Sequence, residues 1–166
     1  MANLSLEQRQ LCDIQGRLFE LALKNGYDCP AFIQAFMNSR TAAALDDTYD
    51  RLQWAGEEYI LEELNDEVGG LKKAGTLYSA EVMYWTGYTY RYWHYYTGES
   101  SKAIFQTAGA ETMNDCWLGF HTFDVEMAID DLKELYAQQA RRADRKGGEH
   151  PDTSAYLPDW RYPRQF

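Results

Sequence analysis

The strongest fold signal in this chain is the aromatic run at residues 79–98, SAEVMYWTGYTYRYWHYYTG. Seven tyrosines, two tryptophans and one histidine lie within residues 78–96. Threonine and aromatic residues favour strands, but a typical strand has only about 5–6 residues. The run is much longer than that and shows no strict alternation of apolar and polar residues, and Gly98 supplies a helix stop. It therefore predicts a long, buried helix over residues 79–97.

Helix signals recur on the N-terminal side of this run. Ser5 and Gln8 form a capping box, apolar residues follow at three- and four-residue steps, and Gly26 ends the pattern. Asp28 or Cys29 then caps a second helix. Further helices are expected at residues 41–45 and 54–68, with residues 46–53 forming a turn that leads into a helix. Tyr59, Ile60 and Leu64 are expected to point inward from 54–68.

On the C-terminal side, helices are expected at residues 100–105, 110–120 and 124–146, and the apolar stripe of the last one includes Tyr136. Three of the four prolines lie in residues 151–166, which prevents a helix there. The sequence therefore predicts an all-α fold: a single helical bundle of about six to eight helices at residues 1–146, followed by an extended proline- and aromatic-rich tail at residues 147–166.

Composition excludes several classes of protein. The chain has 166 residues, 16 of them basic and 26 acidic, for a formal net charge of −10. That charge disfavours nucleic acid and anionic membranes as partners. No apolar run approaches the ~20 residues that span a bilayer, and the N-terminal residues lack the pattern of a signal peptide. Three widely spaced cysteines are typical of a reducing cytoplasm, which is the expected location.

The acidic charge is concentrated in one segment. Residues 44–70 contain nine acidic residues and only Arg51 on the basic side, so they carry −8 of the net −10. Such a run is often only a solvated helix face. Alternatively, it attracts a basic protein partner and speeds their encounter. The residues proposed for that contact are Glu57, Glu58, Glu62 and Glu63.

Catalytic, metal and cofactor motifs are absent from the sequence, so no cofactor and no metal are expected. Cys116 and His121 are five residues apart, without the clustered ligands that zinc requires. His121 and Asp124 could form an acid–base pair, but the favoured interpretation is that His121 caps or packs before the last helix and that Asp124 is its N-cap. Cys12 and Cys116 are expected to be buried and inert, and Cys29 partly exposed.

The aromatic run and the tail each leave alternatives open. The run could pack in the core, face a partner, stack nucleic-acid bases, or line a small-molecule pocket with Tyr88, Tyr92, His94 and His121. The tail could dock on a partner, fold back on its own bundle or stay disordered. Its candidate contacts are of the residue types that dominate interface energies: Tyr156, Trp160, Arg161, Tyr162 and Phe166.

Parts of the sequence resemble two kinds of small bacterial all-helical proteins of unknown function. Residues 84–102, YWTGYTYRYWHYYTGESSK, and residues 119–129, GFHTFDVEMAI, resemble one of them. FIQAF at residues 32–36 and GEEYI at residues 56–60 are similar to the other. Both kinds are encoded beside ADP-ribosyltransferase-like proteins, an arrangement that resembles a toxin–antitoxin operon.

The resemblance implies a non-enzymatic, antitoxin-like protein that neutralises an ADP-ribosyltransferase-type toxin by occluding its active cleft. Gene neighbourhood is an association rather than a mechanism. Two other functions therefore stay open: an enzyme or ligand-binding domain with an aromatic pocket, and a helical scaffold subunit of a larger bacterial or defence assembly.

Overall fold

The computed structural model describes residues 3–48 and 50–148, and within them the chain forms eight α-helices and one short 3-10 helix, with no β-strand. In chain order they are α1 (Leu6–Lys24), α2 (Cys29–Met37), α3 (Arg40–Asp46), η1 (Arg51–Trp54), α4 (Glu57–Val68), α5 (Ala80–Thr97), α6 (Ser101–Thr107), α7 (Ala110–Phe120) and α8 (Val125–Gly148). The all-α bundle is confirmed. Among the residues described, no helix is both long enough and apolar enough to cross a membrane.

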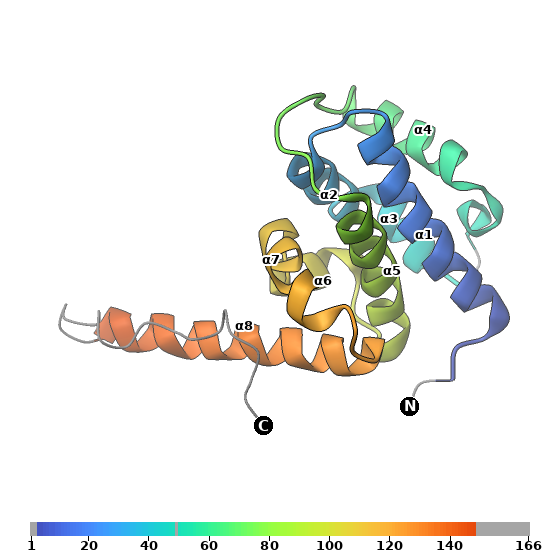
Figure 1. Ribbon diagram of the computed structural model, residues 1–166. Helices are drawn as coiled ribbons and strands as arrows, with labels where there is room; N and C mark the ends of the chain where they lie inside the picture. The colour runs from blue at the N-terminus through green and yellow to red at the C-terminus, as the bar shows by residue number, and fades with distance from the viewer. Residues whose placement is uncertain (1–2, 49, 149–166) are drawn as a thin grey trace.

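Helices α1 and α5 form the central pair of the bundle (Figure 1). Two glycines allow their close approach. A Cβ atom at Gly87 would lie 2.5 Å from the backbone oxygen of Gln15, and one at Gly16 would lie 2.6 Å from the ring of Tyr84. At this contact the Gln15 side chain donates a hydrogen bond to the Gly87 carbonyl oxygen at 2.9 Å. Gly87, which interrupts the aromatic run, is therefore the residue of α5 that packs directly against α1.

The aromatic helix α5 buries one side in the core. Tyr90 and Trp93 are fully buried, and both polar atoms have partners. The Tyr90 hydroxyl donates to the Ala108 carbonyl at 2.6 Å, and the Trp93 indole nitrogen donates to Glu99 at 2.9 Å. These bonds satisfy the polar ends of two large rings, so the rings contribute their apolar area without leaving an unpaired donor.

The predicted helix ends are largely confirmed. Ser5 and Gln8 form the capping box of α1, and the Asp28 side chain caps α2 by accepting from the Ala31 amide. Gly69 and Gly98 end α4 and α5 in the left-handed region, at φ values of 74° and 81°. Glycine pays no Cβ penalty there, which explains why both helices stop at these residues.

The segment between α3 and α4 differs from the prediction. Residues 51–54 form the 3-10 helix η1, and α4 begins at Glu57 rather than near residue 54. Asp50 starts η1 by accepting from the Leu52 amide at 2.9 Å, and Gly56 precedes α4 in an extended conformation. The structure therefore has a 3-10 turn and an extended residue before α4, whereas the sequence predicted a turn over residues 46–53 followed directly by a helix from residue 54.

The last helix packs against the bundle with its first half only. Its buried hydrophobic residues are Ala128, Ile129, Leu132 and Leu135, and its second half extends away from the other helices (Figure 1). The prediction that Tyr136 lies in the core is wrong, since 48% of this residue is exposed. The helix runs to Gly148, two residues past the expected boundary at residue 146. The rest of the predicted tail lies outside the described residues.

Candidate partner-binding site

Two carboxylates of the acidic segment accept hydrogen bonds from other helices of the bundle. Asp46, at the end of α3, accepts hydrogen bonds from the Arg91 guanidinium group at 2.7 Å and from the Ser101 amide at 2.9 Å. Glu67, in the last turn of α4, accepts from the Arg40 amide at 2.7 Å and the Thr41 amide at 3.0 Å. The interpretation of the whole segment as one solvated acidic face is therefore wrong at these two positions.

Glu67 fixes the position of α4 relative to α3. Burial alone would raise the pKa of this carboxyl group. The amides of Arg40 and Thr41 and the Thr41 hydroxyl donate to the charged form, and together they lower its pKa. The bonds reach the first residues of α3, where backbone amides have no intrahelical acceptor. The C-terminal end of α4 is thereby attached to the N-terminal end of α3.

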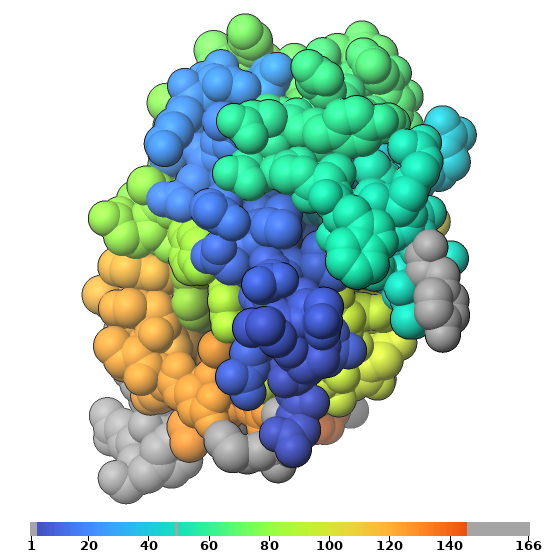
Figure 2. Space-filling model, turned by 90° about the vertical axis from the view of Figure 1, so that its right-hand side faces the viewer, coloured from blue at the N-terminus to red at the C-terminus, as the bar shows by residue number. Residues whose placement is uncertain are grey.

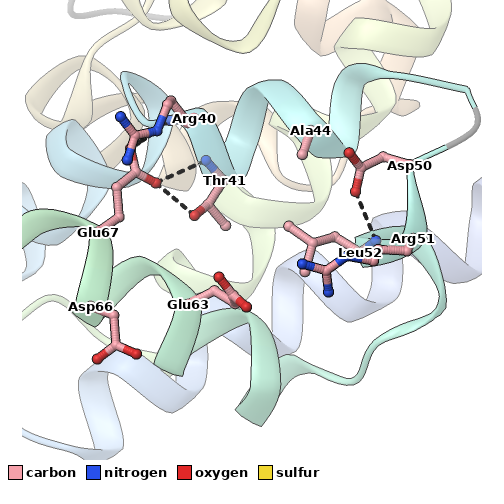
Figure 3. Close-up of a pocket in the computed structure, with 9 residues that line it drawn as sticks. All are labelled: Arg40, Thr41, Ala44, Asp50, Arg51, Leu52, Glu63, Asp66 and Glu67. Atoms are coloured by element: carbon pink, nitrogen blue, oxygen red, sulfur yellow. Dashed lines mark hydrogen bonds and ion pairs between the residues drawn. The ribbon is translucent and has the colours of Figure 1, made fainter.

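An open cleft of about 420 Å³ lies between α3, η1 and α4 (Figure 3). We call it the acidic cleft. Four carboxylates and two guanidinium groups line it, so its formal charge is −2. Glu63 extends from α4 toward Arg51 of η1 (Figure 3). The lining residues are Arg40, Thr41, Ala44, Asp50, Arg51, Leu52, Glu63, Asp66 and Glu67.

Two exposed aromatic residues lie on elements that form the acidic cleft, although neither lines it: Trp54 ends η1 and Tyr59 is on α4. We call them the aromatic rim. Trp54 is 80% exposed and Tyr59 43% exposed. In a 3-10 helix the residues i and i+3 eclipse each other, which places Trp54 on the same side of η1 as Arg51. Arg51 donates to the Tyr59 hydroxyl at 3.4 Å. The cleft-lining arginine thus links Tyr59 of α4 to η1.

The prediction that Tyr59 points inward is wrong, and helical geometry gives the reason. Tyr59, Glu62, Glu63 and Asp66 follow the i, i+3, i+4, i+7 spacing of one helix face. The buried stripe of α4 is instead Ile60, Leu61 and Leu64. Tyr59 therefore belongs to the charged face.

The four predicted partner-binding glutamates all lie on α4, but they do not form one uniform patch. Glu58 and Glu62 are exposed, while Glu57 and Glu63 are partly buried. Glu63 lines the acidic cleft, and Glu58 does not. Figure 2 shows this side of the molecule, where α4 lies next to α1 and the chain from α3 to α4 lies beside them. Of the four predicted glutamates, therefore, only Glu63 lines the cleft, and the other three lie outside it.

The alternative pocket residues have separate environments. Tyr88 stacks on Tyr92, with ring centroids 6.4 Å apart, and the Tyr92 hydroxyl donates to Glu126 at 2.8 Å. His94 lies 3.7 Å from the Asp46 carboxylate, and His121 stacks on Trp117 at 4.0 Å. Among the described residues, ring contacts join only the two tyrosines of this set. Burial and the Glu126 bond both raise the pKa of Tyr92, which keeps its hydroxyl protonated.

The cysteines lie inside the bundle. Cys12 and Cys116 are buried as expected, and the expectation that Cys29 is partly exposed is wrong. Burial raises the pKa of Cys12 to about 12 and that of Cys116 to about 11. The Cys29 sulfur accepts the Tyr78 amide at 3.3 Å, and burial raises its pKa as well. Protonated, buried thiols are poor nucleophiles and poor metal ligands.

Within the described part of the chain, no three His, Cys, Asp or Glu side chains are grouped closely enough to hold a metal ion. The five tail residues predicted to contact a partner (Tyr156, Trp160, Arg161, Tyr162 and Phe166) lie outside the described residues.

Sequence reasoning missed Trp54, Arg51 and Asp66 as members of the candidate site. The available signal was the position of Trp54 in a polar segment two residues before a glycine, where a helix start was expected. A tryptophan outside the apolar stripe has no local reason to be buried. No protein-family model, curated protein or solved structure matches this chain.

Proposed function

We propose that this protein is a non-enzymatic protein-binding module, and that the acidic cleft with its aromatic rim is its docking face. The observation that carries the proposal is the exposure of Trp54, 80% of which is open to solvent, at the end of the 3-10 helix that contributes Arg51 and Leu52 to a cleft of net negative charge. Tryptophan, tyrosine and arginine dominate the energy of protein interfaces. Trp54 and Arg51 share η1, and Arg51 donates to the Tyr59 hydroxyl. The combination supports docking better than catalysis.

The surrounding charge indicates a basic partner. The exposed carboxylates of Glu58 and Glu62 lie on the helix that forms one wall of the cleft. An acidic surface of this kind steers a positively charged protein toward the cleft and raises the association rate. Desolvated aromatic contacts at the rim would then set the dissociation rate.

The resemblance noted in the sequence supplies a candidate for the partner. If the protein acts as an antitoxin, the partner is a toxin of the ADP-ribosyltransferase type, and the docked module occludes its active cleft. Occlusion needs only a stable complex that covers the cleft of the toxin, so it requires no catalytic group on this chain. That requirement agrees with the inert cysteines and with the separate environments of His94 and His121.

Co-purification tests the proposal directly. The tagged chain is expressed together with the proteins encoded by its neighbouring genes, and the captured material is analysed for identity and stoichiometry. We expect an equimolar complex, and a transferase that is toxic alone but tolerated in the presence of its partner. A protein that purifies without a partner in that strain contradicts the proposal.

Substitution of Trp54 identifies the docking face. We expect Trp54→Ala to raise the dissociation constant of the captured complex by roughly 30-fold, the effect of a hot-spot residue worth about 2 kcal/mol. Tyr136→Ala is the matched control, because Tyr136 is also an exposed aromatic residue but belongs to α8. Equal effects of the two variants would show that the aromatic rim is not the docking face.

A further inference from the structure

We propose that the acidic cleft receives an arginine side chain of the partner, with Glu63 as the principal acceptor. This inference rests on the proposed function, since it assumes that the cleft is the docking face. The distribution of paired and unpaired carboxylates in the cleft indicates which side chain of the partner is recognised there.

The carboxylates of the cleft fall into two groups. Glu67 is occupied by the amides of α3, and Asp50 caps η1 through the Leu52 amide. The side-chain carboxylates of Glu63 and Asp66 make no hydrogen bond and no ion pair with the described residues. A partly enclosed carboxylate without a direct partner favours an incoming cation, because a charge-assisted hydrogen bond is stronger than a neutral one.

The two arginines of the cleft do not remove this preference. The Arg40 guanidinium group lies 4.0 Å from Glu67 and is largely exposed. Arg51 donates to the Tyr59 hydroxyl and attracts Glu63 only at longer range. The cleft keeps a formal charge of −2, so a single guanidinium group would leave it closer to neutral.

Arginine fits this site better than lysine for two reasons. Its planar fork can donate two parallel hydrogen bonds to one carboxylate, here that of Glu63. Its flat face also stacks on aromatic rings, and Tyr59 lies one helical turn before Glu63 on the same face of α4. The cleft, of about 420 Å³, is large enough to admit one extended side chain.

Short peptides test this recognition without the partner. The probes are acetyl-Gly-Arg-Gly-amide, its lysine counterpart and its citrulline counterpart, which has the shape of arginine but no charge. Binding to the full chain is followed by the NMR shifts of backbone amides in α3, η1 and α4. We expect saturable shifts confined to the cleft, in the order arginine, lysine, citrulline, with no detectable binding of citrulline.

Matched variants separate the cleft from general electrostatic attraction. Glu63→Gln and Glu58→Gln each remove one negative charge from α4, but only Glu63 lines the cleft. We expect Glu63→Gln to weaken binding of the arginine peptide by about tenfold, and Glu58→Gln by less than about twofold. Equal losses in both variants, or equal binding of arginine and lysine peptides, would overturn the proposal. Circular dichroism of each variant shows whether the helices are intact.

The result can be distinguished from that of the co-purification experiment. If the partner binds through Trp54 but the peptides show no arginine preference, the cleft assignment is wrong and the docking face stands. If the peptides bind in the cleft but no partner is captured, the proposed function fails and the arginine site stands.

Discussion

The Arg91 guanidinium group donates to the Asp46 carboxylate at 2.7 Å in the interior of the bundle, 45 residues away along the chain. Only 1% of the Arg91 side chain and 13% of the Asp46 side chain are exposed. Arg91 also donates to the Gln15 side chain at 2.9 Å, and Asp46 accepts from Ser101. These bonds join α1, α3, α5 and α6. They hold the C-terminal end of α3, one of the elements that form the acidic cleft.

Removal of one member of this pair should be costly. We expect Asp46→Ala to lower the free energy of unfolding by about 3–5 kcal/mol, because it leaves the charge of Arg91 buried without its anion. Urea denaturation followed by circular dichroism measures the change. The control is Arg17→Met, which breaks the exposed pair of Arg17 with Asp13 and should cost less than about 1 kcal/mol. Similar losses of unfolding free energy in the two variants would show that the buried pair stabilises the fold no more than the exposed pair does.

The close approach of α1 and α5 should not tolerate a side chain at Gly87. A methyl group there would lie 2.5 Å from a backbone oxygen, which cannot move like the end of a flexible side chain. We expect Gly87→Ala to destabilise the protein by about 1–3 kcal/mol through overpacking. In Gly109→Ala the new atom meets its neighbours at 3.8 Å, so only the N-cap preference for glycine is lost. Thermal unfolding of both variants measures the difference, and a neutral Gly87→Ala would contradict the close contact.

Asp28 should make the stability of the protein depend on pH in the acid range. The Thr76 amide is the largest cause that lowers its pKa, and the Ala31 amide lowers it further. Because the folded-state pKa lies below the unfolded value, the carboxylate stabilises the protein above the unfolded pKa of about 3.9. That contribution is lost as the pH falls through the folded-state pKa.

Asp28→Asn tests this contribution. The variant can still cap α2, but it cannot accept both amides as a carboxylate does. We expect it to be less stable than the natural protein at neutral pH and to lose less stability on acidification. Urea denaturation at pH 6 and pH 3 gives the comparison. Parallel losses in the two proteins would exclude Asp28 as a source of the pH dependence.

Charge reversal on α4 should slow association with a basic partner. The variant Glu58→Lys/Glu62→Lys raises the net charge of the protein by four units, and both changes are on the helix that borders the cleft. Its control is Glu111→Lys/Asp115→Lys, which makes the same change at exposed positions with the same i, i+4 spacing on α7. Stopped-flow association at two salt concentrations should show a slower rate and a weaker salt dependence for the α4 variant than for the control. Identical rates would remove the steering role of α4.

The local features of this chain could be predicted because their causes are local. The capping box at Ser5 and Gln8, the cap at Asp28 and the stops at Gly69 and Gly98 each depend on residues only a few positions apart. The aromatic run was predicted to be a helix because its length and lack of alternation exclude a strand. The all-α class followed from these signals without any knowledge of how the helices pack.

The candidate site could be predicted only in part. The acidic segment was identified as a possible docking region from its charge, and Glu63 lies in the cleft. The sequence could not show that Asp46 and Glu67 are used internally, because their partners lie in other helices. Tyr59 was assigned to the wrong face, because it shares the charged face of α4 with Glu63, whereas the buried stripe is Ile60, Leu61 and Leu64.

Composition and periodicity alone determine that this chain is a bundle of helices, where most of those helices end, and that one segment carries the excess negative charge. The packing of α1 on α5 through Gly16 and Gly87, the burial of Arg91 and the cleft beside Trp54 depend on the tertiary structure. The physical reason is the range of the interactions. Caps and stripes act within a few residues, whereas a buried ion pair or a cleft needs side chains that are distant in sequence to meet in space.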